Sequence, residues 1–164
     1  MKVVHYINQF FGGIGGEDFA DVPPKLIKGP VGPGNLLAQI LPDDVQIVAT
    51  IVCGDNYAVE NQPEIKNFVI EQVRASEANL VIAGPCFNAG RYGMAAGAVC
   101  AAVKSELGVS VVTAMSAENP GVDVYRGEIH IVDSGDSPAN MRDVLVKMAG
   151  LGVKLTSGDS IGPP

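Results

Sequence analysis

The sequence predicts an α/β fold in which three layers enclose a doubly wound, mostly parallel sheet of about five strands. Short and almost continuously apolar runs, typical of strands covered on both faces, alternate with longer segments of helical periodicity. Such alternation implies parallel strands joined by right-handed crossovers, as in flavodoxin-like or Rossmann-like sheets. With 164 residues, of which 47% are hydrophobic, the chain is long enough for one domain with a substantial core.

The expected strands are, in chain order, Lys2–Ile7, Gln46–Val52, Asn79–Ala83, Ser110–Ala114 and Glu128–Val132. The expected helices are Asn35–Leu41, Pro63–Ser76, Arg91–Leu107 and Pro138–Gly150. Asn61 and Glu64 have the spacing of a capping box at the second helix. Gly108 ends the third helix, and Ser137 caps the fourth, which begins with Pro138.

Residues 1–155 are expected to form a single α/β domain, followed by a Ser-, Gly- and Pro-rich linker or truncated tail at 156–164. No apolar run approaches the roughly 20 residues that span a bilayer, and the N-terminus has the pattern of a strand rather than a signal peptide. We therefore expect a cytoplasmic protein without a membrane partner. The net charge of −7 argues against nucleic acid, because phosphate binding needs clustered Lys and Arg.

The segments that leave the strands are richer in polar groups than those that enter them. Glycine, amide, carboxylate or thiol groups occur in the four exits at 8–17, 53–57, 84–93 and 115–121, whereas the entering segments are short turns. In an open parallel sheet, ligands bind outside the carboxyl ends of the strands, near a point where the strand order switches. The sequence therefore predicts a binding site at this edge, without naming the ligand.

The third exit, GPCFNAGRYG at 84–93, is the most specific of these signals. A helix beginning near Asn88–Arg91 presents free N–H groups that attract a carboxylate or phosphate. Arg91 is the candidate for a bidentate carboxylate clamp. Cys86 is either a nucleophile whose thiolate the same helix terminus favours, or a small buried hydrophobe. The three cysteines contain no CxxC pair, so neither a disulfide framework nor a metal site is expected.

The other exits leave alternatives open. Asp55 and Asn56 are ligand contacts or turn formers, and Glu118 is a catalytic acid or part of a turn. The residues predicted to bind the ligand are Asn88, Gly90, Arg91, Tyr92, Asp55, Asn56, Tyr57 and Glu118.

Four glycines follow the first strand, at Gly12, Gly13, Gly15 and Gly16. They lack the strand–turn–helix context of a dinucleotide fingerprint, because Pro23-Pro24 follows and the chain is expected to stay irregular to about Gly34. They form either a mobile lid over the site or a plain flexible loop.

Four blocks of the sequence, taken together, resemble a known family. MKVVHYINQFFGGIGGE, VGPG, TIVCGDNY and GPCFNAGRYG occur here in the order found in the N-terminal part of selenoprotein B of the clostridial glycine, sarcosine and betaine reductases. The resemblance implies a complex that reductively removes the amine of glycine or an N-methylated relative. In such complexes component B binds the substrate together with a pyruvoyl-bearing partner subunit, and a selenocysteine displaces the amine. Selenoprotein A then takes the carboxymethyl group, and a third component releases acetyl phosphate.

The family's catalytic selenocysteine lies in the later part of a longer chain, and no selenocysteine occurs here. The resemblance therefore implies an N-terminal domain that binds no cofactor itself and is inactive alone, and it gives Cys86 no catalytic role. Arg91 and the amides around Asn88–Gly90 would bind the substrate carboxylate, with an amine near Asp55 or Glu118. Two alternatives are a stand-alone flavodoxin-like module for a small anion or flavin phosphate, and a structural domain that docks the pyruvoyl-bearing subunit. A homo-oligomer is left open.

Overall fold

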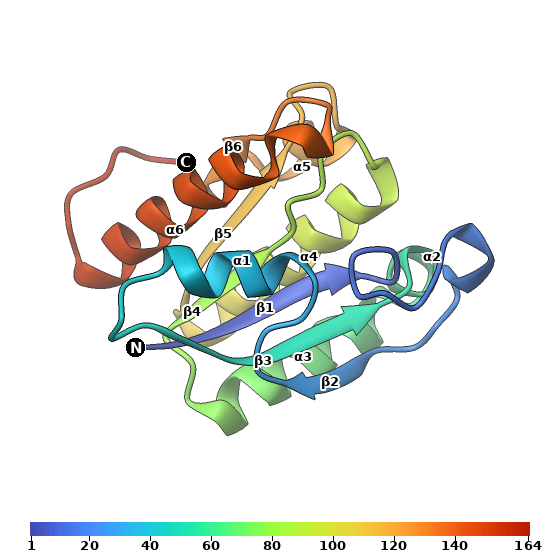
Figure 1. Ribbon diagram of the computed structural model, residues 1–164, viewed down its shortest axis with the longest axis horizontal. Helices are drawn as coiled ribbons and strands as arrows, with labels where there is room; N and C mark the ends of the chain where they lie inside the picture. Colours follow the sequence, from blue (N-terminus) through green and yellow to red (C-terminus); the bar gives the residue numbers. More distant parts are fainter.

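A six-stranded sheet runs through the middle of the molecule in the computed structural model, which describes residues 1–164 (Figure 1). In spatial order the strands are β2 (Lys25–Lys28), β3 (Gln46–Cys53), β1 (Lys2–Asn8), β4 (Leu80–Ala83), β5 (Ser110–Met115) and β6 (Ile131–Asp133). All neighbours are parallel except β2, which pairs antiparallel with β3. The predicted mostly parallel α/β fold is confirmed.

The prediction of about five strands misses β2, which lies in the segment expected to be irregular. This strand is short, and Leu26 within it is 45% exposed, as expected at the edge of a sheet. Its register places Ile27 opposite Thr50 of β3. That pairing is a tertiary contact, and the local pattern of four residues after two prolines does not reveal it.

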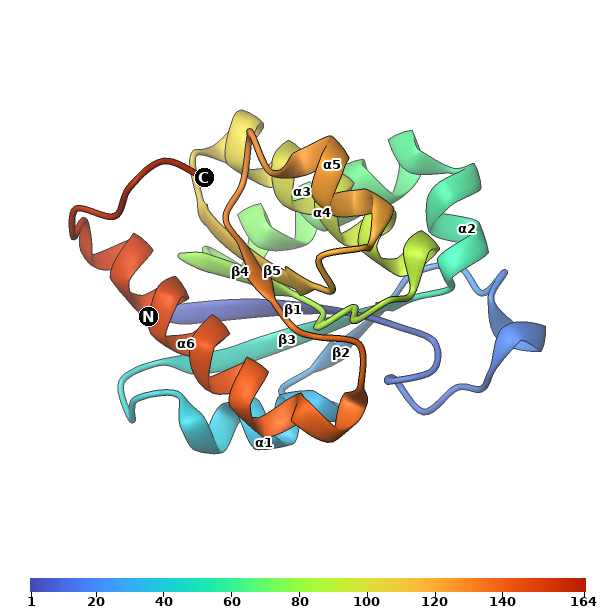
Figure 2. The same ribbon diagram turned by 90° about the horizontal axis from the view of Figure 1, so that it is seen from above.

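Helices cover both faces of the sheet (Figure 2). One face carries α1 (Pro33–Ile40) and α6 (Met141–Ser157), and the other carries α3 (Gln62–Ser76) and α4 (Gly90–Leu107). The central strand β1 alternates between the two layers, because Val3 packs with the α1 and α6 side chains while Val4 and Tyr6 pack with those of α3 and α4. None of the helices is both long and apolar enough to cross a membrane.

The four expected helices are present, with different ends. A short turn, η2 (Pro138–Asn140), precedes α6 and is capped by Ser137 as predicted, and α6 then continues to Ser157 rather than ending at Gly150. The predicted capping box is wrong. Asn61 donates from Nδ2 to the carbonyl oxygen of Tyr57, because it lies between α3 and an unexpected short helix, α2 (Asp55–Glu60). Two further short elements are η1 (Glu17–Phe19) and α5 (Pro120–Tyr125).

Helix α4 packs closely against α5 because its contact positions are glycines. A Cβ atom built at Gly97 would lie 2.1 Å from the ring of Tyr125, and one at Gly93 would lie 2.2 Å from Oδ1 of Asn119. Neither neighbour leaves room for a methyl group without moving. This close approach brings the N-terminus of α4 to the exits of β4 and β5.

We expect Gly97→Ala to lower the free energy of unfolding by about 1–3 kcal/mol, because overpacking outweighs the gain in helix propensity. The matched control is Gly150→Ala in α6, where an added Cβ meets no atom within 4 Å. The control should raise stability by up to about 1 kcal/mol. Urea denaturation of both variants measures the difference, and stabilisation by both would contradict the tight α4–α5 contact.

Candidate functional site

A cavity of about 280 Å³ lies at the carboxyl ends of β1, β3 and β4. Its lining residues are Asn8, Gln9, Phe10, Phe11, Gly16, Glu17, Asp55, Cys86, Phe87, Asn88, Ala89 and Pro138. From β1 the chain passes to β3 on one side and then to β4 on the other, so the strand order switches between β1 and β4. The cavity therefore lies at the kind of switch point where ligands bind in open α/β sheets.

The exit of β4 is held in place by the exit of β5. The Cys86 amide donates to the carbonyl oxygen of Ala114 at 2.8 Å, and the Ser116 amide donates to that of Phe87 at 2.8 Å. Asn119, at the start of α5, donates to the carbonyl oxygens of Phe87 and Ala89 at 3.0 and 3.1 Å. These contacts fix the turn from which α4 begins.

Helix α4 starts at Gly90, within the predicted range. The amides of Gly90, Arg91 and Tyr92 donate no hydrogen bond within the protein. They are the free donors of a helix N-terminus, where the helix dipole favours a negative charge. Asn88 and Ala89, which directly precede the helix, line the cavity. An anion at the rim of the cavity would therefore lie close to these donors.

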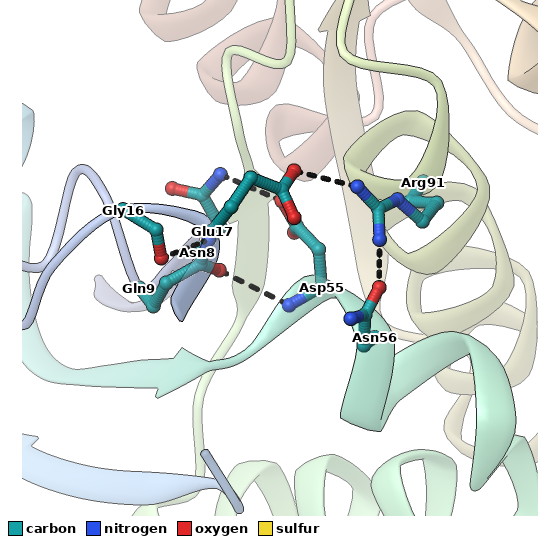
Figure 3. A network of polar contacts seen from close by, with 7 residues as sticks. All are labelled: Asn8, Gln9, Gly16, Glu17, Asp55, Asn56 and Arg91. Atoms are coloured by element: carbon teal, nitrogen blue, oxygen red, sulfur yellow. Dashed lines mark hydrogen bonds and ion pairs between the residues drawn. The ribbon is translucent and has the colours of Figure 1, made fainter. Parts of the chain in front are cut away.

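A polar network joins the exits of β1 and β3 (Figure 3). Nδ2 of Asn8 donates to Oδ2 of Asp55 at 3.0 Å, and the Asp55 amide donates to Oε1 of Gln9 at 3.0 Å. Oδ1 of Asn8 also accepts from the Phe11 amide at 3.0 Å. The first residues after β1 thus orient the Asp55 carboxyl group and shape the glycine-rich loop.

Arg91 connects α4 to both of the other exits (Figure 3). Its Nη2 lies 2.5 Å from Oε1 of Glu17, which follows the four glycines, and its Nη1 donates to Oδ1 of Asn56 in α2. The side chains of Arg91 and Glu17 are 48% and 73% exposed. Glu17 lines the cavity and Arg91 does not. The Glu17 carboxylate therefore lies between the cavity and the Arg91 guanidinium group.

Asp55 is the buried charged group of the cavity. The residue is 7% exposed, and its Oδ1 has no hydrogen-bond partner. Burial raises the pKa of its carboxyl group to about 6, although the hydrogen bond from Asn8 and the charge of Arg91 act in the opposite direction. Asp55 therefore titrates close to neutral pH.

Cys86 lines the cavity but is buried. Burial raises the pKa of its thiol well above the usual value, which disfavours the alternative of a thiolate at the helix terminus. The structure agrees with the alternative that Cys86 is a small buried hydrophobe. No group of three or more His, Cys, Asp or Glu side chains is placed to hold a metal ion.

The structure brings some of the predicted residues together and separates others. Asp55, Asn56, Asn88, Gly90 and Arg91 lie at one edge of the sheet, with Gly16 in the cavity wall. Two predicted residues point elsewhere: the Tyr57 hydroxyl donates to Glu64 at 2.6 Å, and Glu118 is exposed outside the cavity. The Tyr92 ring is buried in the core behind the cavity wall, with its centroid 6.2 Å from that of Phe11.

Gly12, Gly13 and Gly15 lie in the loop between β1 and η1 without lining the cavity. The residues predicted to bind the ligand do not include Asn8, Gln9, Glu17 or the phenylalanines Phe10, Phe11 and Phe87, which also line the cavity. Most of them belong to the polar exit at 8–17, which the sequence indicates as a segment but not residue by residue.

The whole chain, residues 1–164, matches the family model described as Glycine/sarcosine/betaine reductase selenoprotein B (GRDB). The chain belongs to this family. The resemblance carried by the four sequence blocks is thereby confirmed.

The chain is 52% identical over 163 residues to glycine reductase complex component B subunit gamma of Symbiobacterium thermophilum. It is 46% identical over 164 residues to sarcosine reductase complex component B subunit beta of Peptoclostridium acidaminophilum, and 38% identical over 162 residues to the betaine reductase subunit of the same name from that organism. These alignments cover 99–100% of this chain but only 37–38% of the three relatives. No solved structure matches the chain. This member of the selenoprotein B family thus corresponds to part of each relative.

We expect the contribution of Asp55 to stability to fall as the pH rises from about 4 to about 6, where this carboxyl is ionised in the unfolded chain but still protonated in the folded chain. The folded state raises the pKa of this carboxyl from 3.8 to about 6, so it favours the neutral acid and loses that advantage once the group ionises. The loss is at most roughly 3 kcal/mol. In Asp55→Asn this part of the pH dependence should disappear, as urea denaturation at several pH values will show. Asp43→Asn, which changes an exposed loop carboxylate, should retain it.

Proposed function

We propose that this chain provides the N-terminal substrate-pocket and assembly domain of a component B selenoprotein in a glycine, sarcosine or betaine reductase. The observation that carries the proposal is a cavity at the switch point of the sheet, in a chain that belongs to the selenoprotein B family. The overall reaction is the reductive deamination of glycine or an N-methylated glycine toward acetyl phosphate. The domain binds no cofactor of its own. The catalytic selenocysteine lies elsewhere in the full subunit, and a partner subunit carries the pyruvoyl group.

The carboxylate of a glycine-type substrate has two sources of stabilisation at the rim of the cavity. The free amides of Gly90, Arg91 and Tyr92 supply hydrogen-bond donors, and the Arg91 guanidinium supplies a positive charge. In the structure the Glu17 carboxylate pairs with that guanidinium at 2.5 Å. Glu17 is thus an internal counterpart of the substrate carboxylate, and a substrate that replaces it would release the glycine-rich loop.

Replacement of Glu17 by a substrate carboxylate at Arg91 supports the hypothesis that the loop containing Gly12, Gly13, Gly15 and Gly16 is a mobile lid. These glycines lie between β1, which is fixed in the sheet, and η1, whose Glu17 side chain forms an exposed ion pair with Arg91. Exposed ion pairs contribute about 1 kcal/mol or less, so this contact between the loop and α4 is weak, although backbone hydrogen bonds also order the loop. A substrate carboxylate offers Arg91 the same charge and acceptor oxygens as Glu17.

The exposed phenylalanines at this edge favour an assembly role beside substrate binding. Phe10 is 63% exposed and Phe19 is 43% exposed, and they flank the glycine-rich loop. Exposed aromatic groups beside a site are typical of protein interfaces. We propose the pyruvoyl-bearing component B subunit as the partner at this surface. Selenoprotein A and the acetyl-phosphate-forming component act on the assembled complex.

We expect Arg91→Ala to weaken the binding of glycine, sarcosine and betaine by about tenfold or more, because a charge-assisted contact to the carboxylate is lost. Arg74→Ala is the matched control, since this exposed arginine lies in the last turn of α3, away from the strand exits. Titration calorimetry of the wild-type chain and both variants measures the effect. Equal affinity in Arg91→Ala would contradict the proposed role of Arg91 in carboxylate binding. If none of the three compounds binds the wild type, the proposed substrate pocket is wrong.

A further inference from the structure

The walls of the cavity carry two carboxyl groups, and the only nearby cation, Arg91, stands outside the wall and pairs with one of them. Glu17 and Asp55 line it, whereas no Lys, Arg or His does. Phe10, Phe11 and Phe87 supply aromatic surface, with the rings of Phe11 and Phe87 6.3 Å apart. Carboxylates and the faces of aromatic rings both attract cations. The part of a ligand that enters the cavity is therefore expected to be its positively charged end.

One oxygen of Asp55 lacks the donor that a buried acceptor requires. Oδ2 accepts from Asn8, but Oδ1 is shielded from water and has no partner. Figure 3 shows this carboxyl group between Asn8 and Arg91, at the junction of the three strand exits. Buried polar atoms nearly always have a hydrogen-bond partner, so an acceptor without one in a cavity wall calls for an explanation, of which a bound donor is one. Asp55 is thus a hydrogen-bond acceptor, more than nine-tenths buried, in the wall of a cavity that two carboxyl groups line.

We propose that Asp55 recognises an N–H-bearing ammonium group, so that this pocket selects primary and secondary amines over quaternary ones. The inference deepens the proposed function by naming the ligand end that Asp55 binds. Protonated glycine and N-methylglycine both carry N–H donors that reach a single carboxylate oxygen. Trimethylglycine carries the same charge on nitrogen but no N–H, so it leaves the buried Oδ1 without a partner.

The titratable neighbours of Asp55 are either neutral or paired with each other, so Asp55 is the buried group whose negative charge an ammonium group would contact. The titratable and charged groups that interact with Asp55 are Glu17, Arg91, Tyr6, Tyr92, Cys53 and Cys86. Burial raises the pKa of the two phenols and the two thiols, so these groups stay neutral near pH 7. Arg91 and Glu17 neutralise each other in their ion pair. Protonation of Asp55 itself is then the event that abolishes cation binding.

The test uses simple probes that separate charge from hydrogen bonding. Methylammonium and tetramethylammonium are titrated into the wild-type chain, Asp55→Asn and the control Asp43→Asn, and the shifts of the Asn8 and Gln9 side-chain amides are followed by NMR. We expect methylammonium to bind the wild type at least about tenfold more tightly than it binds Asp55→Asn, with the control unchanged. Tetramethylammonium should bind the wild type more weakly than methylammonium. Equal or stronger binding of tetramethylammonium, or methylammonium binding that survives in Asp55→Asn, would overturn the inference.

A second measurement keeps the inference testable if Asp55→Asn does not fold. In the wild-type chain, methylammonium affinity should fall by about tenfold between pH 7 and pH 5, because Asp55 has a pKa raised to about 6. Constant affinity over this range would count against Asp55. The same titration with acetate should show no such loss.

Glycine, sarcosine and betaine, titrated in parallel, separate this inference from the proposed function. Glycine that binds the wild type and Asp55→Asn equally well leaves the proposed function standing and refutes the inference. Methylammonium that depends on Asp55, in a chain that binds none of the three amino acids, refutes the substrate assignment and supports the amine site. Preference for glycine over betaine in the wild type, lost in Asp55→Asn, supports both.

Discussion

The two hydrogen bonds of the Asn8 side chain hold the candidate site together. Asn8 is the last residue of β1, the strand between β3 and β4, and it is 5% exposed. Its amide nitrogen donates to Asp55 at the β3 exit, and its oxygen accepts from Phe11 in the loop that leads to the glycines. Because the carboxyl ends of parallel strands meet at one edge, a single short side chain reaches both segments. The orientation of the Asp55 carboxyl and the path of the loop therefore depend on the same residue.

The remaining parts of the site are joined by contacts of very different strength. The β4 exit is fixed by backbone hydrogen bonds to the β5 exit and by the buried side chain of Asn119, so the N-terminus of α4 is rigid. The glycine-rich loop is joined to α4 through the exposed Glu17–Arg91 pair. Because a single exposed ion pair links the loop to a firmly held anion-binding terminus, a small charged ligand is able to exchange with that pair.

The sequence predicts the parts of the fold that local patterns determine. The buried strands and long helices follow from continuous apolar runs and helical periodicity, and the start of α4 follows from its glycine-rich junction. The edge strand β2 and the failed capping box depend on tertiary neighbours, β3 in one case and α2 in the other. The site shows the same division. Position after a strand identified Asp55 and Arg91, but which side chains face the cavity is set by the rotation of each helix. Tyr57 in α2 bonds to Glu64 instead, and Tyr92 in α4 lies in the core behind Phe11.

The burial of Cys86 separates binding from redox chemistry in this fold. A nucleophilic cysteine requires an ionisable thiol, and the β4 exit places this sulfur in the core, where burial keeps it protonated. At the same edge of the sheet Asp55 is the group that titrates, and its pKa of about 6 allows it to carry a negative charge at neutral pH. A pocket with an ionisable carboxyl group and an unreactive thiol is suited to hold a charged substrate and not to attack it. This fits the proposed division of labour, in which this domain binds the amine and another part of the subunit displaces it.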